Sequence, residues 1–147
     1  MSRAASDARL RRLLGYELWR AAGAFQADAR AALRPLGLRP LTFHALTVID
    51  ETPGLRQAAL AATLGIEGSN VGAVVEDLVA AGWVERTRPP GDMRSYALAP
   101  TEAGRETLAR ATRAVEAREA RMLQGLGGDD RAALRRALRL IEGRGAR

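Results

Sequence analysis

The sequence predicts a mainly α-helical fold with one small β-hairpin, an α+β arrangement, and three observations support this prediction. Apolar residues recur every three or four positions through long segments near both ends of the chain, which is the spacing of amphipathic helices. Glycine and proline interrupt that spacing at a few places, so the helices are separate. Residues 83–98 contain two short strand-like runs around a Pro-Pro-Gly-Asp turn, which is typical of a hairpin.

The first predicted helix runs from about Asp7 to Leu33. Leucine, alanine and phenylalanine recur along one of its faces, and the segment Pro35–Gly37 ends it. A second helix is predicted to begin near Pro40 and to stop before Pro53. Its apolar residues are expected to be buried.

Two more helices are predicted after the hairpin. One runs from Pro100 to about Leu126, and Gly127 with Gly128 breaks it; Asp129 is expected to cap the last helix. The first and last helices present more apolar surface than a small lobe can cover. The sequence therefore predicts a homodimer in which the terminal helices of two chains interleave.

A helix-turn-helix is predicted between the second helix and the hairpin. Gly65 lies where the turn needs a left-handed backbone, which glycine adopts without steric penalty. Ala61 is small enough to let the second helix of the motif cross the first closely. This spacing is what a helix-turn-helix requires. The residues expected on its shared inner face are Leu60, Leu64, Ile66, Val71 and Val74.

The hairpin that follows is predicted to be a wing, with strands 83–88 and 94–98. Its tip carries Arg88, Asp92 and Arg94. In the functional interpretation, Arg94 enters a minor groove, where narrow A·T-rich sequence deepens the negative potential. Asp92 would hold the arginine side chains by a local ion pair. The alternative is an ordinary solvated hairpin.

Charge is distributed unevenly along the chain. The net charge is +6, and all 23 basic residues are arginine. Residues 1–39 hold 8 Arg against 3 acidic residues, residues 40–100 hold 4 against 7, and residues 101–147 hold 11 against 7. The central lobe is therefore net acidic, which counts against a broad electrostatic footprint on nucleic acid but leaves room for a few well-placed arginines.

Composition also excludes several classes of function. The chain has no cysteine, which excludes thiol chemistry and the usual structural zinc sites. One histidine, no phosphate-cradling glycine loop and no metal-spaced cluster argue against an enzyme, and no cofactor or metal is expected. No apolar run approaches the roughly 20 residues that cross a bilayer. The Arg-rich N-terminus lacks the apolar segment of a secretory signal, so we expect a cytoplasmic protein.

The order of these motifs resembles the MarR family of bacterial transcriptional regulators over roughly residues 10–145. The segments that carry the resemblance are GLRPLTFHALTVID, PGLRQAALAATLGI, SNVGAVVEDLVAAGWVER and PPGDMRSYALAPTEAG. Its most specific parts are Asp92-x-Arg94 and Leu98-x-x-Thr101-x-x-Gly104. The resemblance implies a single domain, 1–147, in which residues 7–39 and 101–145 form dimerisation helices and residues 40–100 a winged helix-turn-helix lobe. It also implies an obligate dimer that binds pseudo-palindromic promoter DNA, usually as a repressor.

By position, the resemblance implies a set of DNA contacts. Asn70 is the expected base reader, because an amide side chain can pair bidentately with adenine. Ser69 would face the major groove or, alternatively, cap its helix. Glycine at 68 and 72 leaves few side chains for reading bases, so affinity is expected to rest on the wing, backbone contacts and DNA shape. The full set is Arg56, Gln57, Ser69, Asn70, Gly72, Ala73, Arg86, Arg88, Asp92 and Arg94.

The resemblance further implies a small anionic or phenolic effector, bound between the dimerisation helices and the winged lobe. Arg30 and Arg34, together with Arg39, could neutralise an aromatic carboxylate or the phosphates of an acyl-CoA thioester. The alternatives are core packing for the aromatic residues, an exposed helix position or a satisfied core hydrogen bond for His44, and solvation for the arginines. The residues expected at this site are Trp19, Phe25, Arg30, Arg34, Phe43 and His44.

A rival interpretation treats the winged helix as a protein-interaction module without specific DNA binding. The net acidic charge of residues 40–100 is consistent with it.

Overall fold

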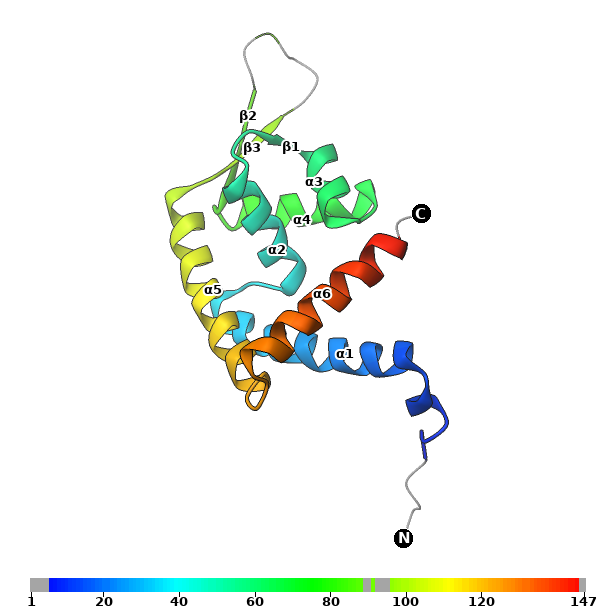
Figure 1. Cartoon of the computed structure of the whole chain (residues 1–147). Coiled ribbons are helices and arrows are strands. Elements are labelled where there is room, and N and C mark those ends of the chain that lie inside the picture. The colour runs from blue at the N-terminus through cyan, green and yellow to red at the C-terminus, as the bar shows by residue number, and fades with distance from the viewer. Residues whose placement is uncertain (1–5, 89–90, 92–95, 146–147) are drawn as a thin grey trace.

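The structure is a computed structural model, and it describes residues 6–88, 91 and 96–145. Asp92 and Arg94, both predicted at the wing tip, lie outside the described residues. Within the described part, long helices and a small sheet follow one another in chain order (Figure 1). They are α1 (Leu14–Leu33), α2 (Pro40–Glu51), β1 (Leu55–Arg56), α3 (Gln57–Leu64), α4 (Gly68–Ala80), β2 (Val84–Thr87), β3 (Ala97–Pro100), α5 (Glu102–Met122) and α6 (Gly128–Gly145).

The elements gather into a lobe and a helical base (Figure 1). The lobe contains α2, α3, α4 and the sheet, and α5 leads from it to the base, where α1 crosses below. An ion pair joins α1 and α5 in the base, with Arg118 Nη1 3.0 Å from Asp28 Oδ1. The mainly helical fold with a hairpin, predicted from the sequence, is confirmed.

The lobe is held by one apolar core, to which α2, α3, α4, the sheet and α5 all contribute. A smaller cluster below it joins Leu33 of α1 to Ala111 of α5. Phe43 and Trp83 contact both clusters, so they connect the lobe to the base. The largest fully buried side chains are Leu33, Leu46, Ile49, Leu60, Leu78, Leu98, Val71 and Val75.

The predicted turn of the helix-turn-helix is confirmed. Gly65 has φ 63° and ψ 34°, and it ends α3 in the left-handed region that glycine adopts freely. The backbone N–H of Ile66 then donates to the carbonyl of Ala61 at 3.1 Å. Leu60, Val71 and Val74 are buried on the inner face of the motif.

The sheet contains a strand that the sequence analysis missed. Its three antiparallel strands lie in the order β1-β3-β2. β1 pairs Leu55 with Leu98, and β2 pairs Val84 with Pro100. The ladder therefore runs beyond the predicted end of the return strand at Leu98, because pairing with β2 extends β3 to Pro100.

The first helix begins later than predicted. A short 3₁₀ turn covers Leu10–Arg12, and Leu13 is extended, with φ −96° and ψ 116°. That extended residue interrupts the helical hydrogen bonds, so α1 starts at Leu14 and not near Asp7.

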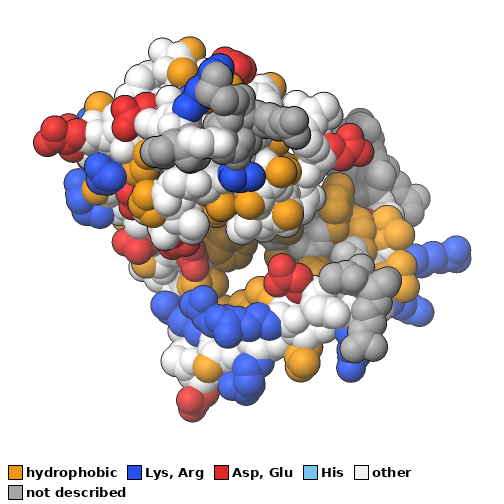
Figure 2. All heavy atoms as spheres, turned by 90° about the horizontal axis from the view of Figure 1, so that it is seen from above, with side chains coloured by type: hydrophobic (Ala, Val, Ile, Leu, Met, Phe, Trp, Pro, Cys, Tyr) orange, Lys and Arg blue, Asp and Glu red, His pale blue; other side chains and the backbone are white. Residues whose placement is uncertain are grey.

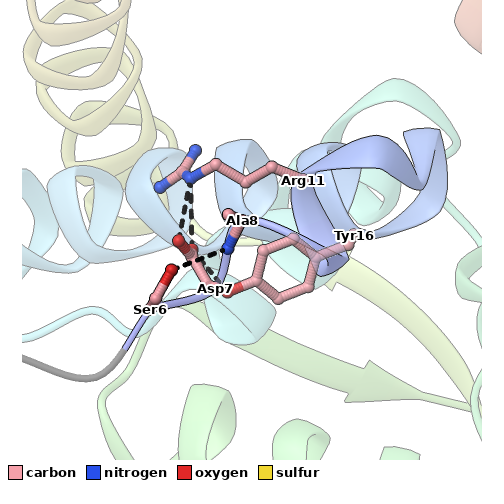
Figure 3. A network of polar contacts seen from close by, with 5 residues as sticks. All are labelled: Ser6, Asp7, Ala8, Arg11 and Tyr16. Atoms are coloured by element: carbon pink, nitrogen blue, oxygen red, sulfur yellow. Dashed lines mark hydrogen bonds and ion pairs between the residues drawn. The ribbon is translucent and has the colours of Figure 1, made fainter.

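Asp7 instead holds the segment before α1 through its side chain (Figure 3). The hydroxyl of Tyr16 donates to Asp7 Oδ2 at 3.0 Å, and Arg11 Nε lies 3.2 Å from Oδ1. The pKa of the Asp7 carboxyl is lowered, chiefly because the Tyr16 hydroxyl donates to the carboxylate. Tyr16 also stacks on Trp19, with ring centroids 5.7 Å apart.

The boundary between the last two helices also differs from the prediction. α5 ends at Met122, and Gly125 in the turn has φ 91°. α6 begins at Gly128, so Asp129 lies inside its first turn and does not precede it as a cap. Gly125, in the left-handed region, lies in the turn after α5. The helix therefore ends before Gly127, where the sequence predicted the break.

The junction between β3 and α5 explains the Thr101-x-x-Gly104 spacing. Thr101 caps α5: its hydroxyl accepts the backbone N–H of Gly104 at 3.0 Å and donates to the carbonyl of Gly82 at 2.6 Å. Gly104 is buried, and a Cβ there would lie 2.1 Å from the carbonyl oxygen of Trp83. Only glycine allows α5 to approach the start of β2 so closely.

The base leaves much apolar surface uncovered. Every described side chain of α6 is exposed. On α1, Leu14 is 75% exposed and Trp19 68% exposed, and on α6 Leu140 is 66% exposed. In the described part of the chain, no single helix is long and apolar enough to cross a membrane; α3 and α4 reach that length only when counted together, across a bend of 112°.

Candidate nucleic-acid interface

The start of α4 presents small and polar side chains away from the core. Val71, Val74, Val75 and Leu78 are buried, so the helical period turns the remaining positions outward. The outward residues include three of the predicted DNA contacts: Ser69, Asn70 and Ala73 are exposed.

The structure decides against the alternative role of Ser69 as a helix cap. Glu67 is the N-cap residue of α4, and among the described residues no side chain accepts a capping hydrogen bond there. Ser69 is the second residue of the helix. Its hydroxyl is therefore exposed in the first turn, where it is available to a partner.

The start of α3 lies against the start of α4. Gln57 is half-buried, and its Nε2 is 3.5 Å from where a Cβ at Gly72 would lie. Arg56, the last residue of β1, is exposed beside it. The structure thus brings the end of β1 and the start of α3 close to the first turns of α4, and these elements lie together in the lobe (Figure 1).

The base of the wing carries two arginines with different partners. Arg86 Nη2 lies 2.6 Å from Glu76 Oε1 of α4. Arg88 Nη2 donates to the Tyr96 hydroxyl at 2.8 Å, and its guanidinium carbon lies 5.0 Å from the centroid of the Tyr96 ring. The hydrogen bond from Arg88 lowers the pKa of the Tyr96 phenol, because the positive charge favours the phenolate.

Sequence reasoning missed Glu76 and Tyr96. The Tyr96 contact has a sequence signal: the hairpin register pairs Arg86 with Leu98 and Thr87 with Ala97, so Arg88 is opposite Tyr96. The contact between Arg86 and Glu76 has no such sequence signal, because it joins a strand to a helix and not two strands of one hairpin.

Charge over this face is mixed (Figure 2). Acidic and basic side chains are interspersed over the upper part of the view in Figure 2. Below it, on the other side of a hollow, basic side chains form a row. The described residues hold no group of three or more His, Asp or Glu side chains that could bind a metal ion.

Neither of two hollows on the described part of the chain gathers the predicted effector residues. A hollow of about 500 Å³ runs along α1, and of the six predicted residues only Trp19 lines it. Phe43 packs between the two core clusters, with the exposed ring of His44 5.8 Å away. Phe25 is 36% exposed on α1. Arg30 and Arg34 are exposed at the end of α1.

Arg39 forms an ion pair with Asp77 of α4. Both residues line a second hollow of about 340 Å³, beside Trp83. The predicted role of Arg39 beside the effector therefore requires it to leave or share this acidic partner.

Comparison with known proteins decides the family. The model of the MarR family matches residues 36–95. Over 125 residues the chain is 33% identical to the HTH-type transcriptional repressor Rv2887 of Mycobacterium tuberculosis, which covers 85% of this chain and 90% of that protein. The chain belongs to the MarR family. The resemblance predicted from the sequence is thereby confirmed.

Solved structures of MarR-family repressors share the fold. The repressor CouR bound to a 23-mer DNA duplex is 39% identical, with a TM-score of 0.88 over 95% of this chain and 99% of that chain. CouR bound to p-coumaroyl-CoA is 36% identical, with a TM-score of 0.85 over 95% and 98%. Rv2887 in complex with salicylic acid is 32% identical, with a TM-score of 0.70 over 88% and 96%.

A Thauera aromatica protein ascribed to transcriptional regulation of the hcr operon is 37% identical over 103 residues, and the match spans 69% of this chain and 62% of that protein. As a member of the MarR family, the chain is a ligand-responsive DNA-binding transcriptional regulator and not an enzyme. Which of its residues contact DNA and effector stays a prediction.

Proposed function

We propose that this chain acts in the cytoplasm as a homodimeric repressor, which binds a pseudo-palindromic operator and releases it when a small aromatic acid or its CoA thioester binds. The observation that carries the proposal is the outward face of α4. Ser69, Asn70 and Ala73 are exposed there, while the opposite face of the helix is buried in the lobe. A helix held in this way can enter a major groove.

The DNA contacts follow from this placement. Asn70 reads a base edge, and Gly72 lets the backbone of α4 approach the duplex closely. Arg56 and Gln57 bind phosphates beside α4, and Arg88 does so from the wing. Arg94 of the wing tip enters the minor groove with Asp92 beside it, as predicted from the sequence.

A second copy of the chain covers the exposed apolar surface of the base. Leu134, Leu138 and Ile141 recur at helical spacing on α6 and are each more than 40% exposed. With the exposed leucines of α1, they make an apolar surface larger than a monomer usually leaves uncovered. Residues 7–39 and 101–145 thus form the dimer interface. Sedimentation of the purified chain should give a dimer, and a monomer would refute this part of the proposal.

The effector class is supported by the relatives. CouR binds p-coumaroyl-CoA and Rv2887 binds salicylic acid, both aromatic and anionic. In this chain, aromatic Trp19 and Phe25 share α1 with Arg30, and Arg34 directly follows it. These side chains offer a ring surface and positive charge to the same ligand. Phe43 and His44 would contact it from α2 if the core packing of Phe43 opened.

The mechanism is a shift in population. A dimer must hold its two recognition helices about 34–36 Å apart to enter successive major grooves. An effector at the junction of base and lobe weakens DNA binding only if it favours a different spacing. A coupling of roughly 1–3 kcal/mol would loosen the operator about 5- to 150-fold.

Selection of bound fragments from genomic DNA tests the DNA-binding part. We expect an inverted repeat with half-sites about one helical turn apart, and binding that weakens steeply with salt. Binding without sequence preference, or none at all, would favour the protein-interaction module instead.

Calorimetric titration with salicylic acid and with p-coumaroyl-CoA tests the effector part. We expect at least one to bind the free protein more tightly than the operator complex. Equal affinity for both forms would refute the mechanism, and absence of heat from both compounds would refute the effector class.

A further inference from the structure

Arg86 and Arg88, at the base of the wing, differ in whether the side chain that each one contacts neutralises its charge. Arg86 faces the carboxylate of Glu76 at 2.6 Å, so the pair is electrically neutral. Among the described residues Arg88 faces the phenol of Tyr96, which accepts a hydrogen bond and, being uncharged, does not neutralise the guanidinium. Arg88 and Tyr96 are both exposed, whereas the Arg86 side chain is only 27% exposed.

We infer that Tyr96 is a positioning residue that holds Arg88 ready for the DNA backbone, whereas Arg86 is bound to Glu76 and braces the wing against α4. This inference rests on the proposed function, since it assigns roles within the same DNA-binding surface. It also separates two arginines that both belong to the predicted set of DNA contacts.

The geometry around Arg88 explains how Tyr96 positions it. The phenol oxygen takes one guanidinium N–H at 2.8 Å, while the ring lies under the guanidinium at 5.0 Å. Two contacts on one planar group fix its direction as well as its place. The guanidinium has five N–H donors, so those that Tyr96 leaves free can reach phosphate oxygens. A side chain that is already ordered loses less entropy when it binds DNA.

The geometry around Arg86 has the opposite consequence. A phosphate that approached Arg86 would compete with a carboxylate already at hydrogen-bond distance and would be repelled by it. The pair instead joins β2 to α4, two elements that meet DNA at different grooves in the proposed complex. Its role is to set the angle between them.

Binding to non-specific DNA tests this inference, because such binding is electrostatic and needs neither the operator nor the effector. The full chain is titrated onto a fluorescent duplex of random sequence at salt concentrations from about 50 to 200 mM. We expect Arg88→Ala to weaken binding and to reduce the slope of log K against log salt by about 0.9 for each lobe on the duplex. Arg86→Ala, the matched control, should leave the slope unchanged and lower the melting temperature.

Tyr96→Phe keeps the ring and removes the hydroxyl. We expect it to weaken binding roughly 2- to 10-fold without changing the slope of log K against log salt. The reason is that the Arg88 side chain, no longer held by the hydroxyl, must be ordered on binding. In the Arg88→Ala background, Tyr96→Phe should have no further effect, because a positioning residue acts only through the group it holds.

Two results would overturn the inference while leaving the proposed function intact. One is an Arg86→Ala variant that lowers the salt slope as much as Arg88→Ala. The other is a Tyr96→Phe effect of equal size in the presence and absence of Arg88, which would mean that Tyr96 acts through hairpin structure or contacts DNA itself. A parent chain that binds no duplex would overturn the proposed function as well.

Discussion

Substitution of Gly104 by alanine tests the close approach of α5 to the wing. The added Cβ would lie 2.1 Å from the carbonyl oxygen of Trp83, whereas real Cβ atoms essentially never come within 3.0 Å of such a neighbour. The backbone of α5 or of Trp83 must therefore move by about 0.9 Å. Neither is a flexible side chain, so the shift disturbs the junction itself.

The expected cost follows from three contributions. Forcing an extra methyl into a packed site costs about 1–3 kcal/mol. The Trp83 carbonyl also accepts the backbone N–H of Thr101 at 3.0 Å, and weakening that bond adds about 1 kcal/mol. Alanine returns about 1 kcal/mol because it favours helix over glycine. Gly104→Ala should therefore destabilise the fold by about 2 kcal/mol and lower the melting temperature by roughly 4–8 °C.

Thermal and urea denaturation at one fixed protein concentration measure this effect, since dimerisation makes stability depend on concentration. Gly68→Ala is the matched control: Gly68 is also helical, but an added methyl there would meet no neighbouring heavy atom within 4 Å, so this variant should keep the parent stability or gain up to about 1 kcal/mol from helix propensity. If Gly104→Ala melted at the parent temperature or above it, helix propensity alone would govern the site. The packing argument would then be wrong.

Three further predictions concern single residues. Thr101→Ala removes the N-cap of α5 and should cost about 1–2 kcal/mol in urea denaturation, whereas Thr101→Ser should keep most of it. Gly65→Ala places a side chain at φ 63° and should cost about 1–2 kcal/mol, measured in the same way; an unchanged midpoint would contradict the left-handed turn. Tyr96 should ionise at lower pH than a free tyrosine, because Arg88 favours its phenolate, so this contact stabilises the fold more at pH above the usual tyrosine pKa than below it. In a spectrophotometric titration, Arg88→Ala should move the Tyr96 pKa back up, and no movement would mean that the two groups do not interact.

The candidate site was only partly predictable from the sequence. The outward position of Asn70 follows from helical period, and its exposure in α4 agrees with the prediction. The helix that contains Ser69 begins two residues earlier than a serine cap at this position requires, because Glu67 is the N-cap residue. Phe43 has the apolar character of a ligand contact, yet two core clusters meet around it. Periodicity identifies buried positions but does not say which other elements surround them.

The sequence by itself determined the helices, the turn at Gly65 and the hairpin, because each depends on residues within a few positions of one another. The same local spacing predicted the amphipathic character of α1 and α6. Tertiary structure alone decided the third strand, β1, the need for glycine at 104 beside Trp83, and the pairing of Arg86 with Glu76. These features join segments far apart in the chain, and their geometry exists only once the helices have packed around a common core.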